Sequence, residues 1–409
     1  MRRLLLTFCL VVAFAAATIA AQGVTHVQAE NRSPQAPKPP RPPDSPGWQW
    51  GVEGHAFFGY NYQLREFTDF DTWESQNWLM ASGVGTFGTS RVRLIGMLSF
   101  EPFTLHDIGS PQVFQTGETF GGAPLIDYQH PHDLIMNLGG DYTRTIGGTN
   151  LIIAGYVVGP APIGPPVFMH RPSAAENPQA PLGHHYLDST HITPGVISAG
   201  VGRHGWTFEA GIFQGREPDE NRLDVDMGAL DSYSGRLSWT RGPWSAQVSA
   251  ASLTTPERTS PYDADRVTAS VSYERGNEQR SLAWLAAFGQ NREFHGNFEA
   301  YLFEATRRTG RHALYTRAEW VAKDILDTGF HPIGTAHTHR QSPVSALTLG
   351  YSHDLFASTI TRWGSFALGG DITGYLVPDN LEDSYGAPLS MHVFVRYRGK
   401  ARAAPTHVH

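Results

Sequence analysis

Polar and apolar residues alternate one by one over much of the chain, in runs of roughly ten residues. The clearest run has an apolar row of Trp244, Ala246, Val248 and Ala250 and a polar row of Ser245, Gln247 and Ser249. Because successive side chains of a strand point to opposite faces, each run predicts a strand with one apolar and one polar face.

About sixteen such runs follow residue 47, a number in the range of bacterial outer-membrane barrels. They lie at 48–62, 74–86, 90–102, 133–145, 150–159, 191–203, 205–214, 230–241, 243–254, 264–275, 279–290, 295–308, 311–323, 343–356, 362–377 and 389–398. We therefore predict an all-β fold: a transmembrane, antiparallel, up-and-down β-barrel of about 16 strands, within a range of about 14 to 18. A soluble β-sandwich is the alternative, because one of its faces can be equally polar.

The connections between these runs favour the barrel, because short and long ones alternate. Short ones fall at 87–89, 146–149, 204–205, 241–243, 275–277 and 309–311, and long ones at 63–73, 103–132, 160–190, 215–229, 255–263, 324–342 and 378–388. This order collects the tight turns at one end and the large loops at the other, as in outer-membrane barrels with periplasmic turns and external loops. An even number of strands also places both chain ends on the periplasmic side.

The composition of the N-terminal residues predicts that the chain is exported, and it completes the predicted domain organisation. Residues 1–22 have the pattern of a cleaved signal peptide, with Arg2 and Arg3 before an apolar stretch and small residues at Ala20 and Ala21. Residues 23–46 are a Pro-rich, extended linker that could contact periplasmic partners, 47–398 are the barrel, and 399–409 are a flexible tail. The predicted location is the bacterial outer membrane, with membrane lipid as the partner of the apolar faces.

Charge and cysteine content exclude several classes of function. The 31 basic residues are dispersed among 38 acidic ones, which gives no indication of nucleic-acid binding. The one cysteine, Cys9, lies in the signal segment, so the mature chain has neither a disulfide nor a thiolate metal site.

Histidine is the residue type that suggests chemistry, with 19 copies and a concentration in the two longest loops. In the YQHPHD segment, two histidines that flank a proline point to the same side of an extended chain and have an aspartate beside them. The second loop adds a Met-His pair, a His-His dipeptide and a following Asp and His. Imidazole nitrogens suit transition metals, so a Cu or Zn ion is the candidate cofactor. The candidate ligands are His130, His132, Asp133, His170, His184, His185, Asp188 and His191.

The same residues also suit a structural role. A rigid, Pro-rich loop that folds into a barrel lumen needs buried hydrogen bonds, and histidine and aspartate side chains can provide them. The sequence leaves open whether these groups bind a metal or anchor a loop that narrows the pore.

Two motifs in these loops, YQHPHDLIMNLG and MHRPSAAENPQAPLGHHYLDSTHI, resemble those of a family of uncharacterised bacterial outer-membrane barrel proteins. Members of that family occur near metal-handling and copper-resistance functions. The resemblance covers most of the mature chain; it implies a barrel with a metal association and specifies no ligand set.

The leading hypothesis is an outer-membrane channel, porin-like, with small solutes, transition-metal ions or metal chelates as cargo. One alternative is a non-conducting surface barrel that binds metal. A hydrolase at the barrel rim is the second alternative, but no G-x-S-x-G nucleophile motif is present, so we expect no enzyme activity.

Overall fold

A computed structural model describes residues 47–258, 260–277, 279–294, 296–323, 325–326, 341–355 and 364–399. The predicted signal peptide, the linker and all but the first residue of the predicted tail lie outside these residues. Strands dominate the described part of the chain. They are β1 (Gly47–Arg65), β2 (Thr68–Glu74), β3 (Asn77–Phe87), β4 (Ser90–Leu98), β5 (Ser110–Phe120), β6 (Ala123–Gln129), β7 (Ile135–Ile146), β8 (Thr149–Gly159), β9 (Thr193–Arg203), β10 (Trp206–Phe213), β11 (Ser232–Arg241), β12 (Trp244–Leu253), β13 (Ala264–Gly276), β14 (Arg280–Glu293), β15 (Gly296–Thr309), β16 (His312–Lys323), β17 (Ser342–Asp354), β18 (Gly364–Leu376) and β19 (Leu389–Gly399).

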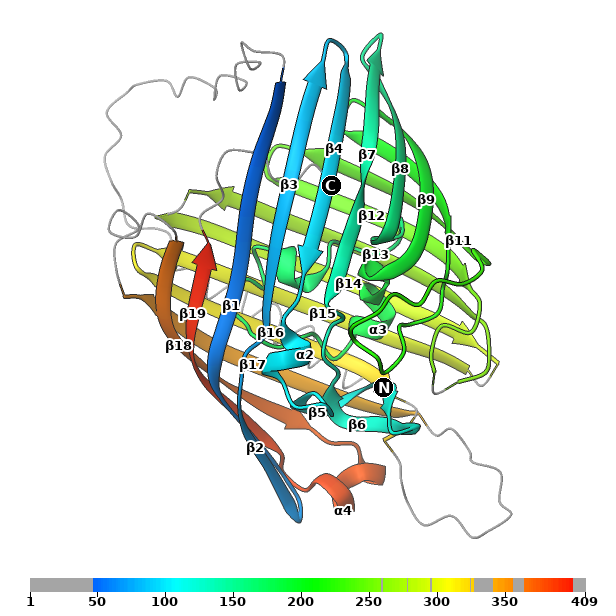
Figure 1. Ribbon diagram of the computed structural model, residues 1–409. Coiled ribbons are helices and arrows are strands. Elements are labelled where there is room, and N and C mark those ends of the chain that lie inside the picture. Colours follow the sequence, from blue (N-terminus) through cyan, green and yellow to red (C-terminus); the bar gives the residue numbers. More distant parts are fainter. Residues whose placement is uncertain are drawn as a thin grey trace. The chain divides into compact units, whose positions relative to one another are not determined.

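Seventeen of these strands form one antiparallel sheet that closes on itself (Figure 1). The closing pair is β1 with β19, in a register that sets Gly59 opposite Phe394. β1 pairs with both β2 and β3, which are separated only by Ser75 and Gln76, so these two strands share one position in the wall. The barrel therefore has 16 wall positions, which confirms the predicted fold and strand number.

The alternation along each strand becomes an inside and an outside. On β19, Met391, Val393 and Val395 are exposed, whereas the alternating His392, Phe394 and Arg396 are buried. Outward apolar side chains recur on the other strands, as a lipid-facing surface requires, and closure leaves no unpaired sheet edge in the bilayer.

Charged residues on the inner face pair with each other across neighbouring strands. Arg93 on β4 donates to Asp141 on β7 at 2.5 Å, and Arg236 on β11 donates to Glu209 on β10 at 2.8 Å. These pairs offset the cost of placing charge inside a protein, because each guanidinium has a carboxylate partner.

The two ends of the barrel differ as the loop lengths predict. The turns of β3–β4 and β7–β8 lie at the top of Figure 1, and β2 and the short helix α4 (Glu382–Tyr385) lie at the opposite end. The predicted long loop at 63–73 is wrong: β1 and β2 continue as a hairpin that turns at Glu66 and Phe67. The hairpin resembles a loop in sequence because Asp69 and Asp71 are exposed on the outward face of β2.

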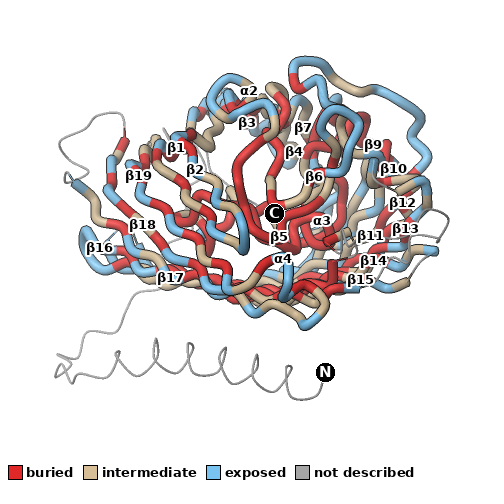
Figure 2. Tube along the Cα trace, turned by 90° about the horizontal axis from the view of Figure 1, so that it is seen from below, coloured by how far each residue is buried: buried red, intermediate tan, exposed pale blue. Residues whose placement is uncertain are grey.

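The two longest connections fold back into the barrel. Residues 99–134 contain the four-residue helix α2 (Glu101–Thr104) and the two-stranded β5–β6 sheet. Residues 160–192, called the plug loop below, contain the 3-10 turns η1 (Phe168–His170) and η2 (Ser189–His191) and the helix α3 (His184–Leu187). Seen from the loop end, α3 and β5 lie inside the ring of strands (Figure 2). Among the described residues, no helix is long and apolar enough to cross a membrane.

The plug loop is buried along almost its whole length, with only Pro160 and Pro172 exposed. It is attached to the wall by hydrogen bonds to β15 and β16, including Leu182 N to Glu319 at 2.6 Å and Thr306 Oγ1 to the Ser173 carbonyl at 2.7 Å. The loop thus occupies the lumen at the loop end of the barrel instead of extending into solvent.

Candidate metal centre

Three histidines from the two inward-folded connections converge. His132 follows β6, His184 begins α3, and His191 ends η2. One ring nitrogen of each lies within 4.8 Å of a ring nitrogen of the other two, close enough for a single ion to contact all three. The three residues are called the three-histidine site below.

In each of these rings, Nδ1 lies within hydrogen-bond distance of an oxygen atom. His132 Nδ1 lies 2.7 Å from Glu101 Oε2, His184 Nδ1 lies 2.6 Å from Asp188 Oδ1, and His191 Nδ1 lies 2.9 Å from the Asp188 carbonyl oxygen. An acceptor at Nδ1 selects the tautomer with its proton there, which leaves a lone pair on Nε2. Within the described part of the chain, Nε2 of His132 and Nε2 of His191 are buried without a hydrogen-bond partner. Metal-binding histidines commonly have this arrangement, with a carboxylate or carbonyl that orients the ring from behind.

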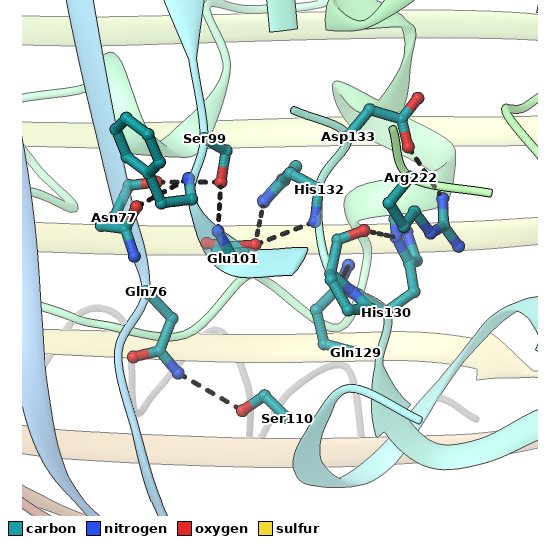
Figure 3. A network of polar contacts seen from close by, with 12 residues as sticks. Gln76, Asn77, Ser99, Glu101, Ser110, Gln129, His130, His132, Asp133 and Arg222 are labelled. Carbon is teal, nitrogen blue, oxygen red and sulfur yellow. Dashed lines mark hydrogen bonds and ion pairs between the residues drawn. The ribbon is translucent and has the colours of Figure 1, made fainter. Parts of the chain in front are cut away.

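Glu101, which orients the His132 ring, is itself fixed by hydrogen bonds (Figure 3). Its Oε2 also accepts the backbone N–H of His132 at 2.9 Å, and its own N–H donates to Ser99 Oγ at 3.1 Å. The residue is buried at the start of α2, directly after β4. The barrel wall therefore fixes one ring of the site through a short turn.

Asp188 is fixed by a buried arginine. Arg171 donates to Asp188 Oδ2 at 2.5 Å and to Glu304 Oε1 on β15 at 2.7 Å. This chain of contacts connects the carboxylate behind His184 to the barrel wall. Because Arg171, Asp188 and Glu304 are fully buried, the orientation of the histidine rings depends on the plug loop being docked.

The electrostatic environment favours neutral rings at two of the three positions. Burial lowers the pKa of His184 to about 4, although Asp188 opposes this effect, and burial lowers the pKa of His191 well below its usual value. Burial acts in the same direction on His132, but the Glu101 carboxylate outweighs it and the pKa of His132 is raised. His184 and His191 are thus ready to donate a lone pair at neutral pH, and a metal ion would displace the second proton from His132.

The structure places the other predicted ligands around this site in different roles. His130 Nε2 lies 3.0 Å from Glu118, and its ring centroid is 6.1 Å from that of His132. Asp133 pairs with Arg222 at 3.3 Å and is not part of the three-histidine site.

His170 and His185 also belong elsewhere. The His170 ring packs against Trp78, with centroids 4.8 Å apart. His185 Nδ1 contacts Glu217 at 2.6 Å and Glu257 at 3.5 Å, which forms a second group of potential ligands. The two carboxylates outweigh burial and raise the pKa of His185 to about 10, so this ring is protonated at neutral pH and offers no lone pair.

Asp188 was among the residues predicted from the sequence, but the other carboxylates that contact the histidines were not. Glu101, Glu217 and Glu257 come from three different connections and meet the histidines only in the folded barrel. No local spacing marks them, since an acidic residue after a strand is common in loops.

Cavities adjoin the histidines. A space of about 20 Å³, lined by residues that include His130, His132, His184 and His191, has room for an ion or a water molecule. A cavity of about 540 Å³ reaches from His191 and His170 to the β3–β4 and β7–β8 turns. Another, of about 740 Å³, lies along β13–β15 near their turns.

Comparisons with known proteins concern the fold. No family model and no curated protein matches the sequence. Similar solved structures include an anion-selective porin from Comamonas acidovorans, with 14% identity over 86% of this chain and 100% of that chain and a TM-score of 0.47. A loop L8 deletion mutant of OmpT, an outer membrane protein of Vibrio cholerae, is 10% identical over 85% of this chain and 99% of that chain, with a TM-score of 0.45. Identity at this level carries no information on the site.

Proposed function

We propose that this chain is an outer-membrane barrel of the channel type that binds a transition-metal ion at His132, His184 and His191. The observation that supports the proposal is the convergence of three rings whose Nδ1 atoms are each held by a buried acceptor. A purely structural network needs the Nδ1 contacts but has no use for buried Nε2 atoms that lack a partner, as on His132 and His191 in the described chain.

Three imidazoles suit a four-coordinate ion that keeps one open position. Such sites bind Zn²⁺, and imidazole also suits copper, nickel and iron. The open position would allow water or an incoming ligand to exchange, as a metal in transit requires. We infer that the metal is cargo and not a permanent structural ion, because the site adjoins the cavity that leads to the turn end.

A non-conducting, metal-binding barrel is the second candidate. The burial of the plug loop favours it, since a lumen filled on the loop side would carry little current. Both candidates share the three-histidine site and the outer-membrane location that the apolar outer face supports. Planar-bilayer recordings separate them: current through the purified barrel supports the channel, and its absence supports the binding protein.

The site itself is tested by Co²⁺ and Zn²⁺ titration of the folded barrel in detergent. We expect binding to fall at least tenfold in His132→Ala and His184→Ala and to remain unchanged in His312→Ala, which removes an exposed histidine of β16. Equal affinity in all four proteins, with heat-modifiable migration showing that each barrel is folded, would exclude the three-histidine site.

A further inference from the structure

Three methionines form a row on the inner wall next to the three-histidine site. Met80 on β3 lies directly opposite Met97 on β4 in the strand register, and Met136 is on the next strand, β7. All three are buried and belong to one packed cluster, with exposed fractions of 8%, 4% and 1%. Adjacent wall positions thus present thioethers at one level of the lumen.

A bulge brings the third methionine to this level. The register of β4 with β7 shifts between Met97, which faces Asn137, and Leu98, which faces Ile135. Met136 lies in the β7 segment that the shift spans. A bulge turns a side chain that regular pairing would direct elsewhere, and bulges are frequent beside functional sites.

The row faces the same cavity as two of the histidines. The cavity of about 540 Å³ is lined by Met80, Met97 and Met136 together with His170 and His191. Met169, on the plug loop, packs against the methionine cluster. Four of the chain's 7 methionines therefore meet where the plug loop borders this cavity.

Inner-face residues farther along the same strands are mostly polar. Arg93 and Asp141 on β4 and β7 line the cavity nearer its turn end. The inner face of these strands therefore changes from charged groups near the turn end to thioethers next to the plug loop. Thioethers are soft ligands that favour Cu(I) over Zn²⁺ and over the hard cations.

We propose that Met80, Met97 and Met136 form a second metal site, for a soft monovalent cation such as Cu(I) or Ag(I), at the inner end of this cavity. Met169 can supply a fourth thioether from the plug loop. The proposal that this site binds a metal depends only on the methionine row. The proposal that it is a second binding site for metal that passes the three-histidine site rests on the function proposed above.

The competing reading is that the methionines only pack against the plug loop, since Ile192 and Val225 contact the same cluster. Leucine has nearly the volume of methionine and typically costs less than about 1.5 kcal/mol in a core, so Met→Leu removes the sulfur and keeps the packing. The test protein is the full mature barrel with Met80→Leu, Met97→Leu and Met136→Leu combined. Its matched control is Met227→Leu with Met391→Leu, because both of these residues are exposed.

The experiment measures Ag⁺ equivalents retained after desalting in chloride-free buffer, and sulfur scattering around Cu(I) by X-ray absorption. We expect the triple variant to lose one Ag⁺ equivalent and the sulfur signal, whereas the control keeps both. Co²⁺ titration of the same proteins should be unchanged, which separates this site from the histidines. Equal Ag⁺ retention in the triple variant and the control would overturn the methionine site, and loss of Co²⁺ binding only in His132→Ala would leave the three-histidine site intact.

Discussion

Neutralising Glu176 should release the plug loop from the barrel wall. The Glu176 carboxylate is buried in the plug loop and accepts hydrogen bonds from Arg308 at 2.6 Å, Ser352 Oγ at 2.6 Å, Arg398 at 3.0 Å, and Arg396. These partners come from β15, β17 and β19, so one side chain joins the loop to three wall positions.

The magnitude follows from the charges that remain. In Glu176→Gln, Arg308 and Arg396 keep Asp354 as their carboxylate partner, at 2.5 Å and 2.7 Å, whereas Arg398 loses the carboxylate that it contacts. Removing one partner of a buried ion pair costs about 3–5 kcal/mol. Because Asp354 remains and the Arg398 side chain is 35% exposed, we take the lower end, about 3 kcal/mol. That corresponds to a roughly hundredfold shift of the loop towards its undocked state.

Planar-bilayer conductance and limited proteolysis of the loop report this shift. We expect a larger open-state current and faster cleavage within 160–192 in Glu176→Gln than in the wild type. Glu274→Gln is the control. Glu274 lines the 740 Å³ cavity that Glu176 also lines, and it makes no ion pair in the described structure. Unchanged current and unchanged protease resistance in Glu176→Gln would refute the role of this clamp.

The same carboxyl sets the pH response of the clamp. Burial opposes ionisation of Glu176, but Arg396, Arg398 and Arg308 prevail and hold its pKa below its usual range. A carboxyl with a depressed folded pKa stabilises the docked loop above its unfolded pKa and loses this effect only as pH falls through the folded value. Acidification from pH 7 to about 5 should therefore leave the loop docked in the wild type.

Three further predictions concern the site and the wall. Glu101→Gln removes the charge behind His132 and should weaken Co²⁺ binding by about 10- to 100-fold in a titration, while His312→Ala has no effect; full affinity in Glu101→Gln would show that the contact does not orient the ring. Zn²⁺ at a hundred times its dissociation constant should stabilise the folded barrel by about 2.7 kcal/mol in urea unfolding, and a chelator should abolish the gain; a gain that persists in His184→Ala would place the ion elsewhere. Gly205 has a φ of +85° and an added Cβ would meet the Thr240 carbonyl, so Gly205→Val should lower the free energy of unfolding by about 1–3 kcal/mol. Gly96→Ala, which has free space around the new Cβ, should lower it less, and equal stability of the two variants would contradict the turn geometry.

The wall of the barrel could be read from the sequence nearly residue by residue. Alternation with a period of two is a local property, and lipid outside with a polar lumen inside imposes it on every strand. For this reason the predicted run at 150–159 corresponds to β8 at Thr149–Gly159, and that at 389–398 to β19 at Leu389–Gly399. The error at 63–73 arose because the exposed Asp69 and Asp71 of β2 interrupt its outward apolar row, which makes the segment resemble a loop in sequence.

The sequence also determined which residue types could bind a metal, since the histidines gather in two connections. Only the tertiary structure decided which of them meet. His132 and His184 are 52 positions apart in sequence, and the inward folding of both connections brings their rings together. The acceptors behind the rings, the clamp at Glu176 and the methionine row come from separate strands and loops. Their grouping depends on how the strands are registered and on where the loops dock, and both are long-range features that no local pattern of residues specifies.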